Sequence, residues 1–485
     1  MIGTLSTTLR RLALFVGLLF LALLVNVNVV QVVRAGDLAN KPGNTRSLIA
    51  EYGKPRGAIL VGGAPVASSK AGEGRLKYER VYANGPVYVS ATGFYSLVYG
   101  RTGIERAENP VLSGSDPRFA VQNLSDLIAG RTSNGGSVLL TLNPKAQQAA
   151  YDGMKGRIGA VVAIQPSTGA LLALVQSPSF DPNGLASNDP ATEQATWEKL
   201  IADANQPMLN RPLVELSPPG STFKIVTASA ALASGRYTPT TLIDAPASIV
   251  LPGTTVSLAN ENRRPCDGGK VTLARALAIS CNTAMAKVGM DLGAAALQQE
   301  AELYGFNNSF QVPMTAATSR FPTDLNVPQT AQSAIGQFDV RATALQMAMV
   351  AAGVANRGLV MAPYLVQEVR GPDLAILETA TATPFNRALT PELAQQMTDM
   401  MVGVVQTGTG TSAQIPGVKV AGKTGTAQTA PGQPDNAWFI AFAPADDPQV
   451  AVAVLVQGTP NLGEISGGRL AAPVAKAVIE AVLQG

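Results

Sequence analysis

The sequence predicts an α+β protein with an N-terminal transmembrane helix, an irregular β-rich domain and a larger domain with a central antiparallel sheet flanked by helices. Three observations predict it. An uncharged apolar run lies near the N-terminus, at 12–25. A Gly-rich stretch with many turn residues follows, between 36 and 136. In the remaining chain, two pairs of apolar runs near opposite ends enclose a long Ala-rich middle, as in an antiparallel sheet that carries a helical layer.

The first predicted element is a membrane anchor at 12–33. Residues 12–25 carry no charge, and the apolar character continues with a few polar interruptions to the end of this 22-residue span. At a rise of 1.5 Å per residue, such a helix covers roughly 33 Å and can cross a hydrocarbon core of about 30 Å. A cleaved signal peptide is the alternative, although no small-x-small cleavage site stands out after Leu24.

The charges beside this span predict its orientation. Arg10 and Arg11 precede it closely, and basic residues favour the cytoplasmic side of a membrane. We therefore expect a cytoplasmic tail at 1–11 and an extracytoplasmic location for everything after Arg34.

Residues 34–136 form the second predicted unit, an irregular and mostly β domain. It contains β-like runs such as "GAILVGG" at 57–63 and "GPVYVSATGFYSLVYG" at 85–100. The polar, glycine-rich cluster "GRTSNGGS" at 130–137 is a predicted hinge. The larger domain is expected at 137–485 and opens with "SVLLTLN", which has the pattern of a strand.

Two hairpins are predicted in the larger domain. The apolar runs at 159–165 and 170–176 are separated by the turn signal "PSTG", and those at 438–444 and 450–458 are separated by "ADDPQ". An apolar helix is predicted at 471–483. Strands from both ends of this domain therefore meet in one sheet.

Composition removes several classes of function. The net charge of +3 comes from scattered lysines and arginines, so the sequence gives no support for nucleic-acid binding. Histidine is absent, which excludes a Ser-His-Asp triad, a Cys-His pair and the usual zinc and non-haem iron ligand sets. There are two cysteines, and neither a phosphate-binding P-loop nor a G-x-G-x-x-G turn is found. No metal and no cofactor are expected, and any nucleophile needs a base other than histidine.

The stretch "LSPPGSTFKIVTASAAL" at 216–232 is the first candidate site. The Pro-Pro-Gly at 218–220 cannot lie inside a helix, so Ser221 is predicted at or just inside a helix N-terminus. Lys224 then lies on the same face within reach of the hydroxyl. The helix N-terminus stabilises negative charge on Ser221 and disfavours a protonated Lys224. An ordinary N-cap serine is the alternative.

A solvated lysine has a pKa of about 10.4, so a Ser-Lys nucleophile and base requires burial or a neighbouring cation. "AGKTGTAQ" at 421–428 supplies a second lysine, Lys423, in a run where glycine permits close approach to a backbone edge. A solvated loop is the alternative.

The third candidate cluster is "ISCNTAMAKVG", in which Ser280 and Asn282 follow a helical run. A hydroxyl and an amide in one short turn can relay a proton and hold a substrate amide. Each of the three clusters is weak alone, but together they form a specific pattern.

S-x-x-K at Ser221, S-x-N at Ser280 and K-T-G at Lys423, in this order, resemble the motifs of the penicillin-recognising serine acyltransferases. Further stretches resemble class B penicillin-binding proteins, most closely the actinobacterial penicillin-binding protein A type. These stretches are "PRGAI" (55–59), "GFYSLVYGRTGIERAEN" (93–109), "SPSFDPN" (177–183), "LNRP" (209–212) and "SAIGQFDVRATALQMAMVAAGVAN" (333–356). The resemblance implies a transpeptidase domain at 137–485 and a non-catalytic, dimerisation-like domain at 34–136, without a glycosyltransferase region.

The resemblance implies D,D-transpeptidation of peptidoglycan stem peptides that end in D-Ala-D-Ala. Ser221 attacks the carbonyl between the two D-alanines, Lys224 accepts its proton, and an acyl-enzyme remains. A side-chain amine of a second stem peptide then attacks the ester, with Ser280 and Lys224 carrying protons. Backbone N–H groups of Ser221 and Thr426 form the oxyanion hole.

The resemblance also implies how the substrate is held. Asn282 holds its amide backbone, while Lys423, Thr424 and Thr426, with Gly425 between them, receive the terminal carboxylate. β-Lactams acylate the same serine as covalent inhibitors. Cell-division or glycan-polymerising partner proteins are implied as well, and no nucleic acid.

Two features depart from the pattern. Cys281 stands in the middle of S-x-N and Cys266 lies fifteen residues earlier, so in an extracytoplasmic region we expect a disulfide between them. Two buried thiols are the alternative. No Glu-x-x-Leu-Asn follows S-x-N, so the deacylating carboxylate of class A β-lactamases is missing and slow ester hydrolysis is expected.

Other functions remain open. A D,D-carboxypeptidase or β-lactam hydrolase would use the same acylation but pass the ester to water. A membrane-bound β-lactam sensor, or an inactive scaffold for a division complex, would acylate once or not at all.

Overall fold

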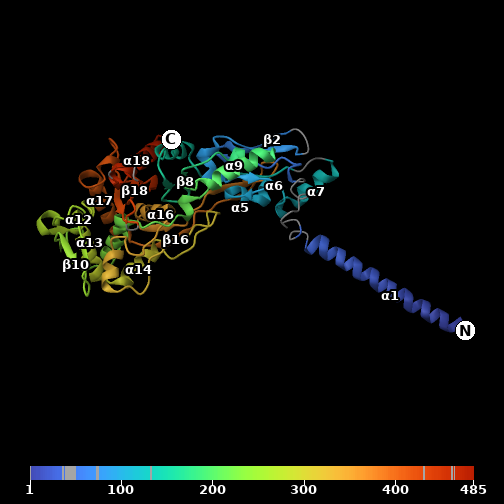
Figure 1. The fold of residues 1–485 in the computed structure, drawn as a ribbon, viewed down its shortest axis with the longest axis horizontal. Helices are drawn as coiled ribbons and strands as arrows, with labels where there is room; N and C mark the ends of the chain where they lie inside the picture. The colour runs from blue at the N-terminus through green and yellow to red at the C-terminus, as the bar shows by residue number, and fades with distance from the viewer. Residues whose placement is uncertain are drawn as a thin grey trace.

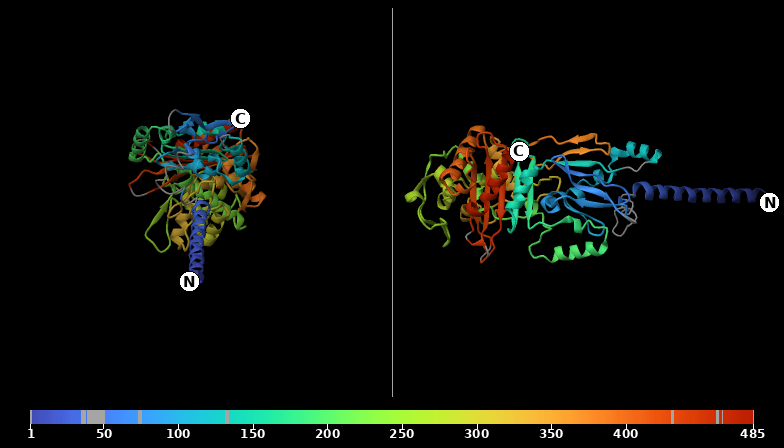
Figure 2. Two further views of the ribbon diagram at one scale, coloured as in Figure 1. Left: turned by 90° about the vertical axis from the view of Figure 1, so that its right-hand side faces the viewer. Right: turned by 90° about the horizontal axis from the view of Figure 1, so that it is seen from above.

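A computed structural model describes residues 2–34, 38, 51–72, 76–130, 134–429, 432–459, 462–463 and 465–484. The predicted hinge at 130–137 lies partly outside these residues. Figure 1 shows one long helix extending away from an elongated body, and Figure 2 shows the same arrangement from two other sides. The N-terminal elements lie at the end of the body nearer this helix, and most of the later elements lie at the far end.

The long helix is α1, Ile2–Asn28, which continues as a π-helical turn, η1, at Val29–Val33. Among the described residues, Thr7–Val33 is the one helix long and apolar enough to cross a membrane, and it has no buried side chains. The predicted span at 12–33 falls within it. A helix that exposes apolar residues on all sides requires an apolar environment, so this element has the properties of a single-pass anchor.

A six-stranded sheet with the order β15-β14-β6-β1-β2-β3 organises the N-terminal part of the body. Its strands are β1 (Ile59–Val61), β2 (Ala64–Ala71), β3 (Tyr78–Tyr82), β6 (Ser137–Leu140), β14 (Val366–Arg370) and β15 (Ile376–Thr379). "SVLLTLN" forms strand β6 as predicted, but β6 joins this sheet and not the central one. It pairs in parallel with β1, and Ile59 and Val138 at the start of that pairing are both fully buried.

One predicted β run is wrong. Residues 85–92 form helix α4 (Gly85–Thr92), followed by two short strands, β4 (Tyr95–Ser96) and β5 (Gly100–Arg101). Its valines and aromatic residue favour a strand, but Pro86 stands in the first helical turn, where its missing N–H is no loss. Apart from this proline the helix is buried, so tertiary packing overrides propensity.

A buried charged cluster ties the N-terminal part together. Arg56 Nε and Arg80 Nε donate to the two carboxylate oxygens of Glu105 at 2.5 and 2.6 Å, and Tyr82 Oη donates to one of them at 3.1 Å. Glu105 is fully buried and the two arginines are nearly so. Each formal charge therefore faces an opposite charge and hydrogen-bond donors or acceptors.

The far part of the body is built on a five-stranded antiparallel sheet with the order β17-β18-β19-β7-β8. Its strands are β7 (Gly159–Ile164), β8 (Leu171–Ser177), β17 (Ala421–Ala427), β18 (Asn436–Ala443) and β19 (Val450–Val456). Both predicted hairpins are confirmed. The two hairpins meet through β19 and β7, which brings the two ends of this region side by side.

Helices cover both faces of this sheet. α16 (Ala344–Ala355) packs on one face, and α8 (Pro144–Gly153) and α18 (Ala472–Leu483) pack on the other. Neighbouring side chains of β18 therefore enter different cores: Trp438 packs in one core and Phe439 in the other. Burial on both faces explains why these strands are continuously apolar instead of alternating.

The remaining elements form a helical layer, short hairpins and connections. They are α5 (Gly103–Ala107), α6 (Asn109–Ser113), α7 (Ala120–Ile128), α9 (Pro190–Ala202), α10 (Arg211–Val214), α11 (Lys224–Ala233), β9 (Leu242–Asp244), β10 (Ser248–Val250), β11 (Ser257–Ala259), β12 (Lys270–Thr272), α12 (Leu273–Ala278), α13 (Asn282–Leu292), α14 (Ala294–Leu303), α15 (Val327–Ser333), β13 (Leu359–Met361), β16 (Pro384–Arg387) and α17 (Pro391–Thr407). The buried helix α11 contacts α13, α14 and α17, so its N-terminus is fixed from several sides.

Candidate active site

Ser221 lies in a single 3₁₀ turn, η4 (Gly220–Phe223), which leads directly into helix α11. The predicted position at a helix N-terminus is therefore confirmed. The N-cap residues of η4 and α11 are Pro219 and Phe223, so Ser221 is not an ordinary capping serine. Its hydroxyl forms no hydrogen bond within the described residues, and it lines a large cleft.

Gly220 permits this position. Its φ is +52°, in the left-handed region that favours glycine, and a Cβ there would lie 2.8 Å from the backbone oxygen of Thr426. The turn that carries the serine is thus pressed against strand β17.

Lys224 begins α11 and its side chain is fully buried. Its amine donates to the backbone oxygen of Ser280 at 2.8 Å and to Asn282 Oδ1 at 2.6 Å, and lies 3.3 Å from Ser280 Oγ. No hydrogen bond joins it to Ser221 in the described part of the chain, although the sequence predicted the two side chains within reach. A neutral amine has two N–H donors and one lone pair, and two carbonyl acceptors occupy those donors. The lone pair is left to accept a proton.

Ser280 and Asn282 lie in the turn between α12 and α13, with Asn282 opening α13. Ser280 has a φ of +59°, a sparsely populated conformation for a serine. Asn282 Nδ2 donates to the backbone oxygen of Ala259 at 3.1 Å, so both ends of this amide are engaged within the chain. The asparagine orients Lys224.

Lys423 reaches the same point from the central sheet. It lies in β17, is fully buried, and donates to Ser280 Oγ and to the backbone oxygen of Thr424, both at 2.9 Å. Ser280 Oγ therefore stands between the two amines. It accepts from Lys423 and keeps its own proton for Lys224 or a substrate atom.

Gly425 lies against the turn that carries Ser221. A Cβ at this position would lie 3.0 Å from the backbone oxygen of Pro219 and 3.0 Å from the Thr222 side chain. The close approach of this turn therefore favours a glycine here. The neighbouring residue Thr424 shares a hydrogen bond of 2.5 Å with Thr409, and both threonines line the cleft.

The two amines have lowered pKa values. Burial, and next the positive charge of Lys423, hold the pKa of Lys224 well below its usual range, while Glu261 acts in the opposite direction. Burial lowers the pKa of Lys423 to about 7, again opposed by Glu261. The neighbouring cation expected from the sequence is present, but desolvation is the larger cause.

The cleft has a volume of about 930 Å³. Among the predicted residues, Ser221, Ser280, Asn282, Thr424 and Thr426 line it, and Lys224 and Lys423 lie buried beneath. The structure thus brings the three clusters together. Sequence reasoning missed several lining residues, among them Glu261, Arg263, Thr409, Gln337, Asp435 and the 466–469 segment. The glycine-rich segments "GTGT" and "SGGR" are the signals that could have indicated two of these positions.

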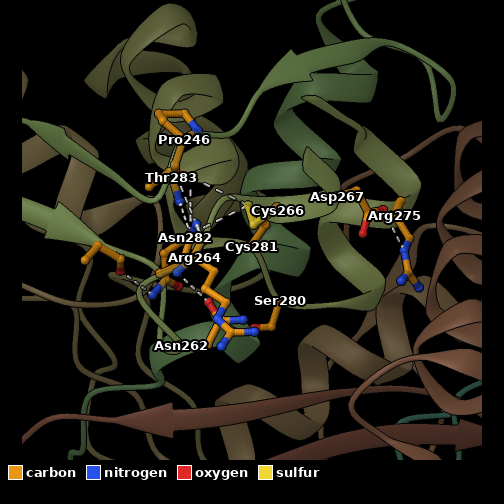
Figure 3. Close-up of a disulfide and its surroundings, with 12 residues drawn as sticks. Pro246, Asn262, Arg264, Cys266, Asp267, Arg275, Ser280, Cys281, Asn282 and Thr283 are labelled. Atoms are coloured by element: carbon orange, nitrogen blue, oxygen red, sulfur yellow. Dashed lines mark hydrogen bonds and ion pairs between the residues drawn. A yellow bond between two sulfur atoms is a disulfide. The ribbon is translucent and has the colours of Figure 1, made fainter. Parts of the chain in front are cut away.

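A disulfide joins Cys266 and Cys281, as expected, with Cα atoms 6.3 Å apart. Figure 3 shows this bond beside Ser280 and Asn282. Asn260 holds the same turn by accepting from the Thr283 backbone N–H at 3.0 Å. The loop before the S-x-N turn is therefore attached to it both covalently and by hydrogen bonds.

Comparison with known proteins places this geometry in a family. Residues 159–480 match the model described as penicillin binding protein transpeptidase domain, and residues 56–138 match the penicillin binding protein A dimerisation domain. The chain is 44% identical to the peptidoglycan D,D-transpeptidase PbpA of Mycolicibacterium smegmatis, over 99% of both chains. The protein of the same name from Mycobacterium tuberculosis is also 44% identical, over 99% of both.

A solved structure is similar throughout the body. The ceftriaxone acyl-enzyme complex of penicillin-binding protein A from M. tuberculosis superposes with a TM-score of 0.87 at 44% identity, covering 90% of this chain and 100% of that one. The chain therefore belongs to the class B penicillin-binding proteins, in the branch that carries the penicillin-binding protein A dimerisation domain.

Proposed function

We propose that this protein is a peptidoglycan D,D-transpeptidase that cross-links stem peptides through an acyl-enzyme on Ser221 and is acylated there by β-lactams. One observation carries the assignment of roles. Ser221 faces the cleft without a hydrogen-bond partner in the described residues, one turn before a buried lysine whose N–H groups are already engaged. The names of the relatives support the reaction class.

In the first half of the reaction, Ser221 Oγ attacks the carbonyl between the two terminal D-alanines and its proton passes to the lone pair of Lys224. The C–N bond then breaks, and the leaving D-alanine takes the proton from Lys224. Backbone N–H groups of Ser221 and Thr426 stabilise the oxyanion, at about 3 to 4 kcal/mol per donor. An ester on Ser221 remains.

In the second half, an amine of another stem peptide attacks that ester. Ser280, hydrogen-bonded to Lys423 and close to Lys224, carries protons between the incoming amine and Lys224. Thr424 and Thr426, with the Lys423 charge behind them, receive the carboxylate of the donor peptide. Asn282 positions Lys224, because its side-chain oxygen accepts from the amine. Its Nδ2 donates one N–H to Ala259 and keeps the second for the substrate amide.

The protein's setting is part of the same proposal. Arg10 and Arg11 favour a cytoplasmic tail at 1–11, which puts the cleft outside the membrane. The non-catalytic domain at 34–136 and the transpeptidase domain at 137–485 complete the organisation, and the latter contributes strands β6, β14 and β15 to the N-terminal sheet. The non-catalytic domain offers a surface for division or glycan-polymerising proteins.

Mass spectrometry after incubation with penicillin G tests the nucleophile. The parent protein is expected to gain one penicillin mass on the peptide that contains Ser221, and Ser221→Ala is expected to gain none. A labelled stem peptide with an amine acceptor tests the transfer. Release of D-alanine without an acceptor adduct would indicate the carboxypeptidase instead, and a single acylation without turnover would indicate a sensor.

A further inference from the structure

Glu261 occupies a fixed position at the cleft. It follows strand β11 and stands next to Asn260, whose side-chain nitrogen donates to the backbone oxygens of Pro246 at 3.0 Å and Arg264 at 2.8 Å. Asn260 is 6% exposed, and its carbonyl receives the Thr283 hydrogen bond described above. The backbone that carries Glu261 is therefore attached to the S-x-N turn through Asn260.

The carboxylate of Glu261 is available to a ligand. Its side chain is exposed and lines the same cleft as Ser221 and Ser280. Within the described residues it has no ion pair and no hydrogen bond, although Arg263 stands two positions away. A free carboxylate on a cleft wall is a binding group for a cation.

The charge of Glu261 also affects the two lysines of the site. Glu261 acts on the pKa of Lys224 and of Lys423, raising both against burial. Asp435 is another carboxylate of the cleft lining, but it is not among the charges that shift either lysine. The two acidic residues therefore differ in their relation to the reacting groups.

In the second half-reaction, a cationic acceptor must approach a site that already contains two amines, and the Glu261 carboxylate can offset this repulsion. The side-chain amine of an acceptor has a solution pKa near 10.4, so it arrives as an ammonium ion. The cleft floor already holds two amines, and like charges repel an incoming cation. A negative group at the mouth of the site attracts the ammonium and holds it close to the groups that remove its proton.

We propose that Glu261 binds the ammonium group of the acceptor amine before transfer, an inference that rests on the function proposed above. The bound ammonium loses one proton to neutral Lys224 by way of Ser280, and the free amine attacks the ester carbonyl. The new C–N bond forms and the Ser221 C–O bond breaks. Lys224 returns its proton to Ser221 Oγ, and the second proton lost by the amine nitrogen goes to solvent.

Acceptor kinetics with the full-length protein in detergent test this role. The donor is a labelled stem pentapeptide, and the acceptors are Nα-acetyl-lysine amide, which is cationic, and hydroxylamine, which is uncharged at pH 7.5. Glu261→Gln is expected to raise KM for the lysine acceptor about tenfold with kcat within about twofold, and to leave the hydroxylamine reaction within about twofold. Glu261→Asp is expected to restore part of the loss. Asp447→Asn, the control, removes an exposed carboxylate outside the cleft lining and is expected to change KM for neither acceptor by more than about twofold.

The outcomes distinguish failure of the Glu261 role from failure of the proposed transpeptidase function. A parent protein that transfers to neither acceptor would defeat the transpeptidase proposal itself. Transfer by the parent with an unchanged lysine KM in Glu261→Gln would overturn the inference, as would an equal loss for both nucleophiles or the same effect in Asp447→Asn. Penicillin acylation of Glu261→Gln is expected to be at least as fast as in the parent, because removal of the negative charge favours neutral Lys224. Loss of that acylation would also overturn the acceptor role.

Discussion

The protein buries charged side chains in two regions, and the two regions treat them in opposite ways. In the N-terminal cluster, burial opposes ionisation of Glu105, but Arg80 and Arg56 outweigh it and hold the pKa of this carboxyl below its usual value. In the cleft, burial and a like charge act together on Lys224 and lower its pKa. Burial is nearly complete in both places.

The difference shows that the partner, and not burial, decides whether a buried charge supports the fold or performs chemistry. A buried charge with an opposite charge beside it stays ionised and cannot be removed without cost. A buried amine beside another amine is driven toward its neutral form, in which it can accept a proton. Three substitutions test whether the buried charges of the two regions differ in this way.

The largest effect is expected from Lys224→Met. Removal of the base should lower the rate of penicillin acylation by about 10³-fold, within the range of 10² to 10⁴ typical of general-base catalysis. The melting temperature should fall by only a few degrees, because methionine fills the buried space but leaves the Ser280 and Asn282 oxygens that accept from Lys224 without a donor. Stopped-flow acylation and thermal unfolding measure the two quantities, with Lys476→Met on α18 as control. Slight slowing with a large loss of stability would show that Lys224 is a structural residue.

Glu105→Gln tests the other region. It removes the carboxylate that both buried arginines share, leaving Arg56 only Glu51 as an ion-pair partner, and should lower the free energy of unfolding by about 3 to 5 kcal/mol. Acylation by the folded protein should not change, because the cluster lies outside the cleft. Chemical denaturation gives the free energy, and Glu378→Gln is the control, since Glu378 pairs with Arg118 at the surface and should cost less than about 1 kcal/mol. Equal stability of Glu105→Gln and parent would remove the contrast.

Both regions should gain stability as pH rises, but over different pH ranges. Lys423 has a folded pKa of about 7, below its unfolded value, so the unfolded chain binds more protons above pH 7. Stability should therefore rise with pH, by up to roughly 1.4 kcal/mol per unit between pH 7 and about 10, relative to Lys423→Met. The Glu105 carboxyl, with its lowered pKa, contributes stability above its unfolded pKa and loses it as pH falls through the folded value. Unfolding measured from pH 3 to 10 compares the two pH ranges, and parallel curves for the parent and Lys423→Met would contradict the lowered pKa of Lys423.

Much of the far part of the body follows from local sequence. Apolar runs of strand length with turn signals between them predict the hairpins at 159–176 and 438–456. Helix α4 cannot be predicted in this way, because its valines favour a strand and only its surroundings favour a helix. The joining of β14 and β15 to the N-terminal sheet is equally hidden, since they lie more than 200 residues after β6 and no local pattern specifies a partner.

The site divides in the same way. Ser221, Lys224, Ser280 and Lys423 stand out as polar residues in rare spacings. Glu261 and Asp435 do not, because a carboxylate in a polar loop has no distinguishing pattern until the loop is placed beside a cleft. Gly425 was recognised as a point of close approach, and the turn of Ser221 lies against it.

The residue types and their spacing along the chain were sufficient to identify the catalytic groups that the protein can use. With no histidine in the chain, a serine nucleophile here requires another base, and the S-x-x-K spacing supplies an amine on the same helix turn. The desolvation of the Lys224 amine is visible only in the tertiary structure. The same holds for the hydrogen bond from Lys423 to the hydroxyl of Ser280, because these two residues lie 143 positions apart in the sequence. Local spacing fixes neighbours along a helix, whereas desolvation and the field of distant charges depend on how remote segments pack.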